Sequence, residues 1–322
     1  MNQMTRSIAA HQPSTGENPI ASIPTYPAAA QSPPQSDQPS TPTLDFCRSR
    51  PIDAVHCLLS RKQQTSQKGA SLVDAFAWAN DAAAKLKEEF GDRLVFVGLQ
   101  GSRARGEANE ESDIDLVALF DRLDASDLAR YRAIIQSMPH AELACGFVGA
   151  TDVLASWPRH ELFQFAYDTH AILGDLAPIV GAFTRDDALR AARIGASGIY
   201  HAACHAAIFD DDADEMLRSL FKGAFFTMQA IHFARTGVYP RSKAELARIL
   251  KQESETDATG RSEETAPDTN SAARPTRREL AADARILAIG RDWEAHRPAT
   301  NLERQELTDL LLAWAGGIVT AI

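Results

Sequence analysis

The stretch that decides the fold is Gly101-Ser102-Arg103-Ala104-Arg105-Gly106, followed after a short polar segment by Ser112-Asp113-Ile114-Asp115-Leu116. An apolar run at 94–99 comes directly before it and predicts a buried strand. A strand that ends in Gly-Ser at the start of a helical turn exposes backbone N–H groups, and glycine lets a phosphate approach where a Cβ would block it. We therefore expect Gly101 and Ser102 to bind a phosphate, with the Ser102 hydroxyl as an additional donor.

The two aspartates of the second motif stand two residues apart at the start of a predicted strand, 114–120. Asp113 and Asp115 then point to one face, while Ile114 and Leu116 point into the core. Adjacent carboxylates repel, so their place beside a phosphate-binding turn favours one or two divalent cations between them and the phosphates. Oxygen ligands favour Mg²⁺. The alternative is that both aspartates only cap the backbone at a turn.

This combination of groups indicates nucleotidyl transfer, in which an acceptor oxygen attacks the α-phosphate of a nucleoside triphosphate and pyrophosphate leaves. Two magnesium ions about 3.5 to 4 Å apart would stabilise both the attacking and the leaving oxygen. The guanidinium groups of Arg103 and Arg105 suit recognition of the triphosphate, and we favour Arg105 for this role. Alternatively, Arg103 and Arg105 pair on the surface with nearby acidic residues, namely Glu107, Glu110 and Glu111.

The pattern of helices and strands predicts an α/β (α+β) domain with a small mixed sheet at 45–183, followed by an all-α helical bundle at 184–322. In the first domain a helix begins near Ser71, with that residue as its N-cap, and Gly91 ends it. Further elements are expected at 126–138 (helix), 142–148 (strand), 158–167 and 171–173. The helices of the bundle are expected at 187–208, 213–236, 242–251, 279–290 and 302–320.

Composition indicates which segments are disordered, which class of acceptor is favoured and which compartment the protein occupies. Segments 1–44 and 252–277 are rich in polar and small residues, and we expect both to be disordered. The 322 residues carry a formal net charge of −10, which argues against a broad contact with nucleic acid and favours a small-molecule or protein acceptor. No membrane helix or secretory signal is evident, and four scattered cysteines suit free thiols, so we expect a cytoplasmic protein. The cysteines are Cys47, Cys57, Cys145 and Cys204.

The two motifs together resemble the signature of the polymerase β-like nucleotidyltransferase superfamily, in its minimal or antibiotic nucleotidyltransferase-like branch. Gly101-Ser102, ten intervening residues and then Asp113-Ile114-Asp115-Leu116 carry this resemblance. It implies transfer of a nucleoside monophosphate, with ATP as the default donor and Mg²⁺ held by Asp113 and Asp115. The segment from Phe225 to Pro240 is similar to the helical C-terminal domains of such enzymes, which implies that the helical domain closes over the acceptor site.

The resemblance also implies a third acidic residue from a later strand, and Ala141-Glu142-Leu143 matches that pattern. Glu142 would then be the general base or a metal ligand, although a single glutamate at a strand start is also typical of a solvated edge residue. The superfamily contains members that have lost catalysis. A non-catalytic nucleotide-binding or antitoxin-like regulatory module is therefore the alternative function.

Two weaker patterns are interpreted as incidental. His201 and His205 lie four apart on a predicted helix, which is a spacing that metal ligands use, but no third ligand is evident. Arg291 and His296 form an R-x4-H arrangement similar to the ribonuclease motif of HEPN domains, and Pro298 beside them suggests a helix end.

Overall fold

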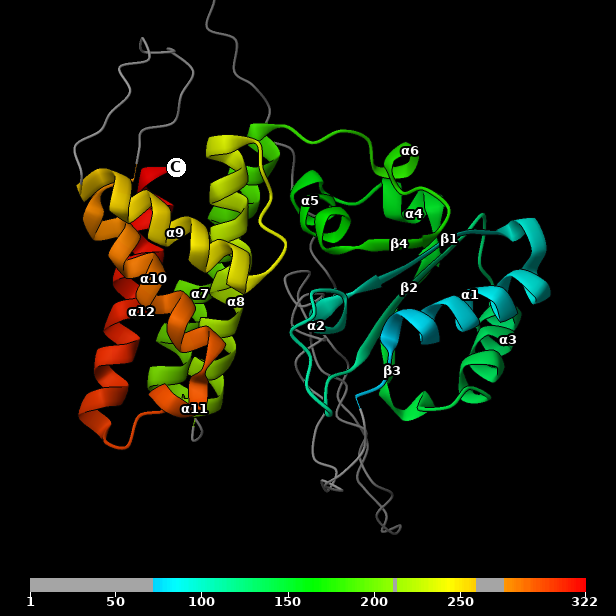
Figure 1. Ribbon diagram of the computed structural model, residues 1–322, viewed down its shortest axis with the longest axis horizontal. Helices are drawn as coiled ribbons and strands as arrows, with labels where there is room; N and C mark the ends of the chain where they lie inside the picture. Colours follow the sequence, from blue (N-terminus) through cyan, green and yellow to red (C-terminus); the bar gives the residue numbers. More distant parts are fainter. Residues whose placement is uncertain (1–71, 211–212, 259–274) are drawn as a thin grey trace, which may run out of the picture. The chain divides into compact units, whose positions relative to one another are not determined.

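The computed structural model describes residues 72–210, 213–258 and 275–322, which all fall within one compact unit. The predicted tail at 1–44, Ser71, Cys47, Cys57 and most of the predicted insertion at 252–277 lie outside these residues. Within them, the predicted fold class is confirmed, because a small mixed sheet surrounded by helices is followed by consecutive helices up to the C-terminus (Figure 1).

The sheet has four strands in the order β3-β2-β1-β4. These strands are β1 (Leu94–Gln100), β2 (Ile114–Phe120), β3 (Ala144–Ala150) and β4 (His170–Leu173). The central strand β1 is antiparallel to both β2 and β4, whereas β2 and β3 are parallel. In the β1–β2 pair Gln100 lies opposite Asp115, so the residues that follow β1 meet the residues that begin β2. This register joins the two sequence motifs in space.

Helices cover both faces of the sheet (Figure 1). On one face α1 (Ala75–Phe90) and α3 (Ala125–Gln136) pack on Leu99 and Leu116. On the other face α4 (Thr151–Ala155), α5 (Arg159–Asp168) and α6 (Ala177–Val180) pack on Val117 and Leu119. Because side chains alternate along a strand, the even-numbered residues of β2 face α1 and the odd-numbered ones face α5. Asp115 therefore lies on the α5 side.

The start of α1 differs from the prediction. Asp74 is the N-cap, since its carboxylate accepts the backbone N–H of Ala77 at 3.0 Å, and the helix begins at Ala75. Aspartate caps a helix as well as serine does, so residue type alone does not favour Ser71 over Asp74. The predicted end at Gly91 is correct, and there a short 3-10 helix, η3 (Gly91–Arg93), leads into β1.

In the second part of the chain the described residues form helices and no strand, as predicted. Its helices are α7 (Arg185–Phe209), α8 (Ala213–Thr236), α9 (Lys243–Ala258), α10 (Arg277–Arg291), α11 (Trp293–His296) and α12 (Asn301–Ala321). A shared apolar core holds them together, including Phe221, Leu250, Ile286 and Leu311. The predicted boundary at 183/184 falls at Thr184, the N-cap of α7. One expectation is wrong: α9 continues to Ala258, so the first residues of the predicted disordered segment 252–277 are helical.

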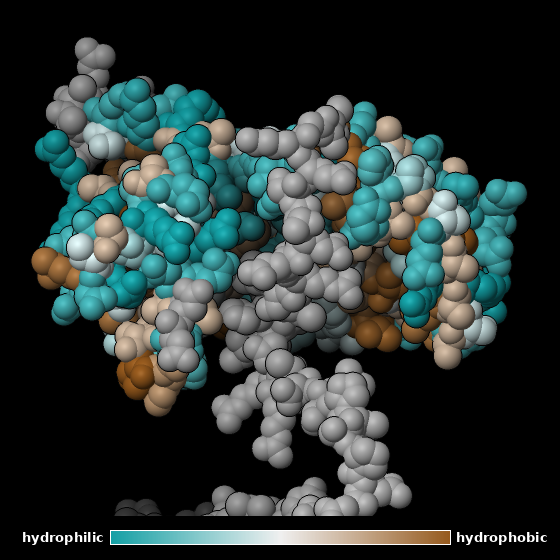
Figure 2. Space-filling view, turned by 90° about the horizontal axis from the view of Figure 1, so that it is seen from below, coloured by the Kyte–Doolittle hydropathy of each residue, from teal (hydrophilic) through white to brown (hydrophobic). Residues whose placement is uncertain are grey.

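On the face seen in Figure 2, hydrophilic residues predominate and apolar residues gather in separate patches among them. None of the helices in the described part of the chain is long and apolar enough to cross a membrane.

Candidate functional site

The turn after β1 is a single helical turn, α2 (Gly101–Ala104), as the first motif predicts. It begins with Gly101 at a positive φ of 74° and is closed by a hydrogen bond from the N–H of Arg105 to the carbonyl of Gly101 at 3.2 Å. A Cβ on residue 101 would overlap the carboxylate of Asp115. Glycine is therefore required here both by its backbone angle and by the approach of the aspartate.

The two aspartates lie beside this turn. Asp113 precedes β2 and is exposed, whereas Asp115 is half-buried as the second residue of the strand. Ile114 and Leu116 between and after them are buried in the core, as the alternation predicts. Burial and the charge of Asp113 raise the pKa of Asp115 to about 6, although Arg105 and Lys222 lower it. The site therefore concentrates negative charge that a cation would relieve.

Arg103 is a structural residue of the turn rather than a surface ion-pair partner of the nearby glutamates. Its side chain is turned inward, with the residue 5% exposed. The guanidinium donates to the carbonyl of Ser112 at 2.9 Å and to the carbonyl of Val73 at 3.0 Å. Its remaining terminal nitrogen has no hydrogen-bond partner among the described residues, and burial lowers the pKa of the group. Arg103 thus ties the turn to the residues that lead into β2.

Arg105, the predicted triphosphate ligand, is held inside the protein. Its side chain is 8% exposed, and one terminal nitrogen donates to both carboxylate oxygens of Asp168 at 2.7 and 2.8 Å. A weaker contact joins its Nε to Glu107 at 3.4 Å, and the guanidinium lies over the rings of Phe225 and Phe226. The carboxylates raise the pKa of Arg105 against the effect of burial. In this arrangement Arg105 contacts carboxylates of the protein itself.

The third predicted carboxylate, Glu142, does not join the pair. It lies in a 3-10 turn, η4 (Ala141–Leu143), before β3 begins, and its side chain is 66% exposed beside His140. The residue of β3 opposite Asp115 is Cys145. Within the ranges that the structure describes, no three Asp, Glu, His or Cys side chains come together as a metal-binding group. The expectation that Glu142 belongs to a strand is therefore wrong, because that strand begins only at Ala144.

Two lysines of the helical part belong to the electrostatic surroundings of the site. Lys222 on α8 lowers the pKa of Asp115. Lys243, at the start of α9, lies near Glu107, which accepts its backbone N–H at 2.5 Å and approaches its ammonium group at 3.8 Å. Burial lowers the pKa of Lys243, and Glu107 opposes this effect. The sequence did not predict a role for either lysine, because a single lysine on an amphipathic helix belongs to no recognisable motif.

The residues of the two incidental patterns have ordinary local contacts. His205 lies 3.3 Å from Asp210, close to the end of the same helix. His201 is exposed on α7, and so is Arg291 at the end of α10. The Nδ1 atom of His296 lies 2.7 Å from the carbonyl of Asp292.

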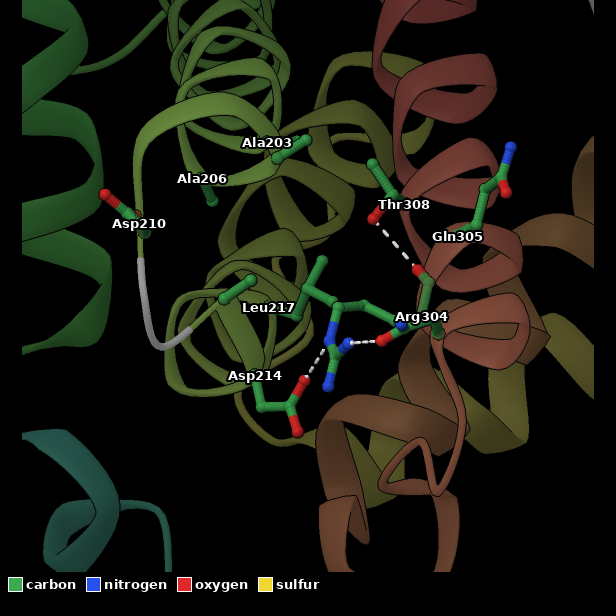
Figure 3. A pocket seen from close by; sticks show the side chains of 11 residues that line it. Ala203, Ala206, Asp210, Asp214, Leu217, Arg304, Gln305 and Thr308 are labelled. Atoms are coloured by element: carbon green, nitrogen blue, oxygen red, sulfur yellow. Dashed lines mark hydrogen bonds and ion pairs between the residues drawn. The ribbon is translucent and has the colours of Figure 1, made fainter.

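A cavity of about 610 Å³ lies among α7, α8 and α12, away from both motifs (Figure 3). Its walls include Ala203, Ala206 and Leu217. The polar groups that cross it are already paired, since Arg304 donates to Asp214 at 2.6 Å and to Asn301 at 2.6 Å. None of the predicted site residues lines this cavity. It is therefore separate from the candidate site.

Comparison with known proteins gave a family match over the turn and the aspartates. The family model of the nucleotidyltransferase domain matches residues 81–140, a segment that contains α2, Asp113 and Asp115. The resemblance to nucleotidyltransferases is confirmed. Beyond this segment, a solved spectinomycin adenyltransferase from Enterococcus faecialis, crystallised with ATP and spectinomycin, is similar at 14% identity and a TM-score of 0.39. That similarity covers 72% of this chain and 97% of the other. The comparison with curated proteins gave no match.

Proposed function

We propose that this chain is a magnesium-dependent nucleotidyltransferase that moves a nucleoside monophosphate, with ATP as the favoured donor, to a hydroxyl group of a small molecule or protein. The observation that carries the proposal is the register of β1 and β2. Gln100 lies opposite Asp115, so the Gly101-Ser102 turn abuts the two carboxylates that begin β2. A phosphate-binding turn and a pair of carboxylates at one point are the parts that this chemistry needs.

The donor set suits magnesium. This ion is commonly held by one or two carboxylates together with water and substrate phosphates, so a third protein carboxylate is not a requirement for binding. Asp113 and Asp115 supply the two. Burial, and after it the charge of Asp113, raises the pKa of Asp115, and a bound cation would offset the repulsion between the two carboxylates. When bound, Mg²⁺ would neutralise phosphate charge and polarise the α-phosphate.

The protein's own groups would do the positioning. The hydroxyl of Ser102 would donate to the triphosphate, and Lys222 and Lys243 would add positive charge from the helical part. In the reaction a bond forms between the acceptor oxygen and the α-phosphorus, and the bond from that phosphorus to pyrophosphate breaks. The hydroxyl proton passes either to water or to Glu142, the residue that the resemblance assigns to this step. Substitution of Glu142 distinguishes these two routes.

The helical part at 184–322 would form the acceptor side of the site. Glu107, two residues beyond Arg105, contacts the start of α9 through the backbone N–H and the ammonium group of Lys243. These contacts place the start of α9 beside the residues that follow the turn, and we expect the acceptor to approach from this side. The acidic net charge of −10 makes a small molecule or a protein a better acceptor than nucleic acid.

A second function has an observation in its favour. Because Glu142 is exposed and forms no metal-binding group with the two aspartates in the part of the chain that is described, the chain could be a regulatory module that binds a nucleotide without turnover. Binding and turnover therefore have to be measured separately.

The deciding experiment measures nucleotide binding and pyrophosphate release with each of the four triphosphates, in Mg²⁺ and in EDTA, together with acceptor pools. It compares the wild type with Asp113→Asn and Asp115→Asn, which keep the side-chain shape. Asp152→Asn, an exposed aspartate on α4, serves as the control. We expect magnesium-dependent release that falls at least about 100-fold in both site variants and is unchanged in the control.

The other outcomes are equally informative. Magnesium-dependent binding with no release in any pool would establish the regulatory module. Absence of binding for all four triphosphates would overturn the assignment of Gly101 and Ser102. Release that persists in both aspartate variants would place the chemistry elsewhere in the protein.

A further inference from the structure

The end of α5 contacts the phosphate-binding turn through three separate groups. The side chain of Gln100, directly before the turn, donates to the carbonyl of Phe165 at 3.0 Å and to the hydroxyl of Thr169 at 2.6 Å. The backbone N–H of Gly101 stabilises the charged form of the Asp168 carboxylate, which lowers the pKa of Asp168 against the effect of burial. The guanidinium of Arg105, directly after the turn, donates to both oxygens of the same carboxylate. Both ends of the turn are thus attached to one point of the fold.

Asp168 is the centre of this attachment, and water has little access to it. Its side chain is 16% exposed, and that of Arg105, against the rings of Phe225 and Phe226, is 8% exposed. A charged pair with several hydrogen bonds in such a place is held firmly, because removal of one partner leaves the other charge buried without compensation.

The attachment also sets the distance between the turn and the aspartates. The backbone of Gly101 lies so close to Asp115 that a Cβ at this residue would overlap the carboxylate. A small displacement of the turn would therefore move Ser102 relative to Asp115.

We propose that Asp168 is a positioning residue of the nucleotidyltransferase site, which acts through Arg105 and the Gly101 N–H to hold the turn in the shape that receives the triphosphate. This role rests on the proposed function. It also reinterprets Arg105, which we place as the partner of Asp168 and not as a direct triphosphate ligand. In the opposite role, the Asp168 carboxylate would compete with the phosphate for Arg105 and the Gly101 N–H. Substitution of Asp168 would then tighten nucleotide binding.

The experiment measures the dissociation constant of a non-hydrolysable ATP analogue with Mg²⁺, together with KM and kcat for pyrophosphate release. The variants are Asp168→Asn, Arg105→Gln, Arg105→Lys and the double variant Asp168→Asn/Arg105→Gln. We expect each of the two neutral single variants to weaken analogue binding about 10-fold or more and to raise KM to a similar extent. Arg105→Lys keeps the charge and should lose less than Arg105→Gln.

The double variant tests whether the two residues act as one unit. If the two residues contribute to analogue binding only as a pair, either single substitution removes the whole contribution. We therefore expect the double variant to bind the analogue about as weakly as the weaker-binding of the two single variants. Independent residues would instead multiply the two losses, to about 100-fold.

Asp127→Asn is the matched control. Asp127 is a buried carboxylate on α3 that pairs with Arg130 and, at 2.5 Å, with Arg93, which lies before the end of β1 opposite to the turn. Its loss should lower the melting temperature as Asp168→Asn does, with analogue binding unchanged. If Asp168→Asn lowers only the melting temperature, its role is merely structural and the proposal is wrong. If it tightens analogue binding, Asp168 competes with phosphate and the proposal is likewise wrong.

Amide exchange separates this proposal from the proposed function. If the wild type binds no triphosphate, the function fails, and hydrogen exchange of the segment around Gly101 still reports on the attachment. We then expect protection in the wild type and in Asp127→Asn and faster exchange in Asp168→Asn. Equal exchange in all three proteins would show that Asp168 does not hold the turn.

Discussion

At the scale of the residue, both the backbone conformation of the turn and the contact with Asp115 require glycine at position 101. Its φ of 74° and its contact with Asp115 are two independent reasons for glycine. We expect Gly101→Ala to abolish pyrophosphate release, because the methyl group would displace either the turn or the carboxylate. Release assays and a melting curve would check this prediction.

Gly106 provides the matched control for that substitution. It also has a positive φ, 69°, but a Cβ there would meet nothing within 4 Å. Gly106→Ala should cost about 1 kcal/mol of stability from backbone strain alone and keep release within about 3-fold of the wild type. Equal loss of release in both variants would mean that strain in the turn, and not the contact with Asp115, limits activity.

Glu142 is the residue on which the sequence and the structure differ most. Because its side chain is 66% exposed and lies ahead of β3, we expect Glu142→Gln to leave turnover within about 3-fold of the wild type. If turnover instead fell by about two orders of magnitude while KM was retained, the acceptor proton would be assigned to Glu142. The 3-10 turn η4, which carries Glu142, would then have to move toward the aspartates when substrates bind.

At the scale of the element, the helices of the C-terminal part pack closely where small residues permit it. A Cβ on Gly290 of α10 would overlap the backbone carbonyl of Phe221 on α8. Backbone atoms cannot rotate away, so Gly290→Ala should separate the two helices and destabilise the protein by about 1 to 3 kcal/mol. Urea unfolding would measure this change.

Gly198 on α7 is the comparison, because a Cβ there would meet nothing within 4 Å. Gly198→Ala should stabilise the protein by about 0.5 to 1 kcal/mol, since alanine loses less backbone entropy in a helix. Opposite signs for these two substitutions would confirm that the α8–α10 contact, and not helix propensity, selects glycine at position 290.

At the scale of the whole molecule, one half-buried carboxylate between helices makes stability depend on pH. Asp283 on α10 accepts the indole N–H of Trp314 on α12 at 2.7 Å, and burial raises its pKa to about 6. The folded protein therefore binds this proton more tightly than the unfolded chain does. Stability falls as the pH rises from the ordinary aspartate value of 3.8 through about 6, by up to about 3 kcal/mol.

Asp283→Asn tests this dependence, because asparagine keeps an acceptor oxygen for Trp314 without the charge. Relative to the wild type, we expect the variant to gain up to about 3 kcal/mol between pH 4 and pH 7.5 in urea unfolding. A difference between the two proteins that stays constant over this range would contradict the raised pKa.

What the sequence determined by itself is local. The strand-turn-strand segment around Gly101, the pairing of Asp113 with Asp115 and the periods of the long helices all follow from contacts between residues near in sequence, which obey the 2.0 and 3.6 repeats of strands and helices. The start of β3, and with it the place of Glu142, depends on pairing with β2 and could not be derived locally.

The tertiary structure alone decided what surrounds those motifs. Asp168 follows Arg105 by 63 residues, and Lys243 follows Glu107 by 136, so no short-range pattern marks either pair. Arg105, the predicted phosphate ligand, pairs instead with a carboxylate of the protein. The guanidinium is buried beside Phe225 and Phe226, and a buried charge requires a charged partner. The partner is Asp168 because α5 ends beside the turn, and α5 takes this position only once the sheet has formed.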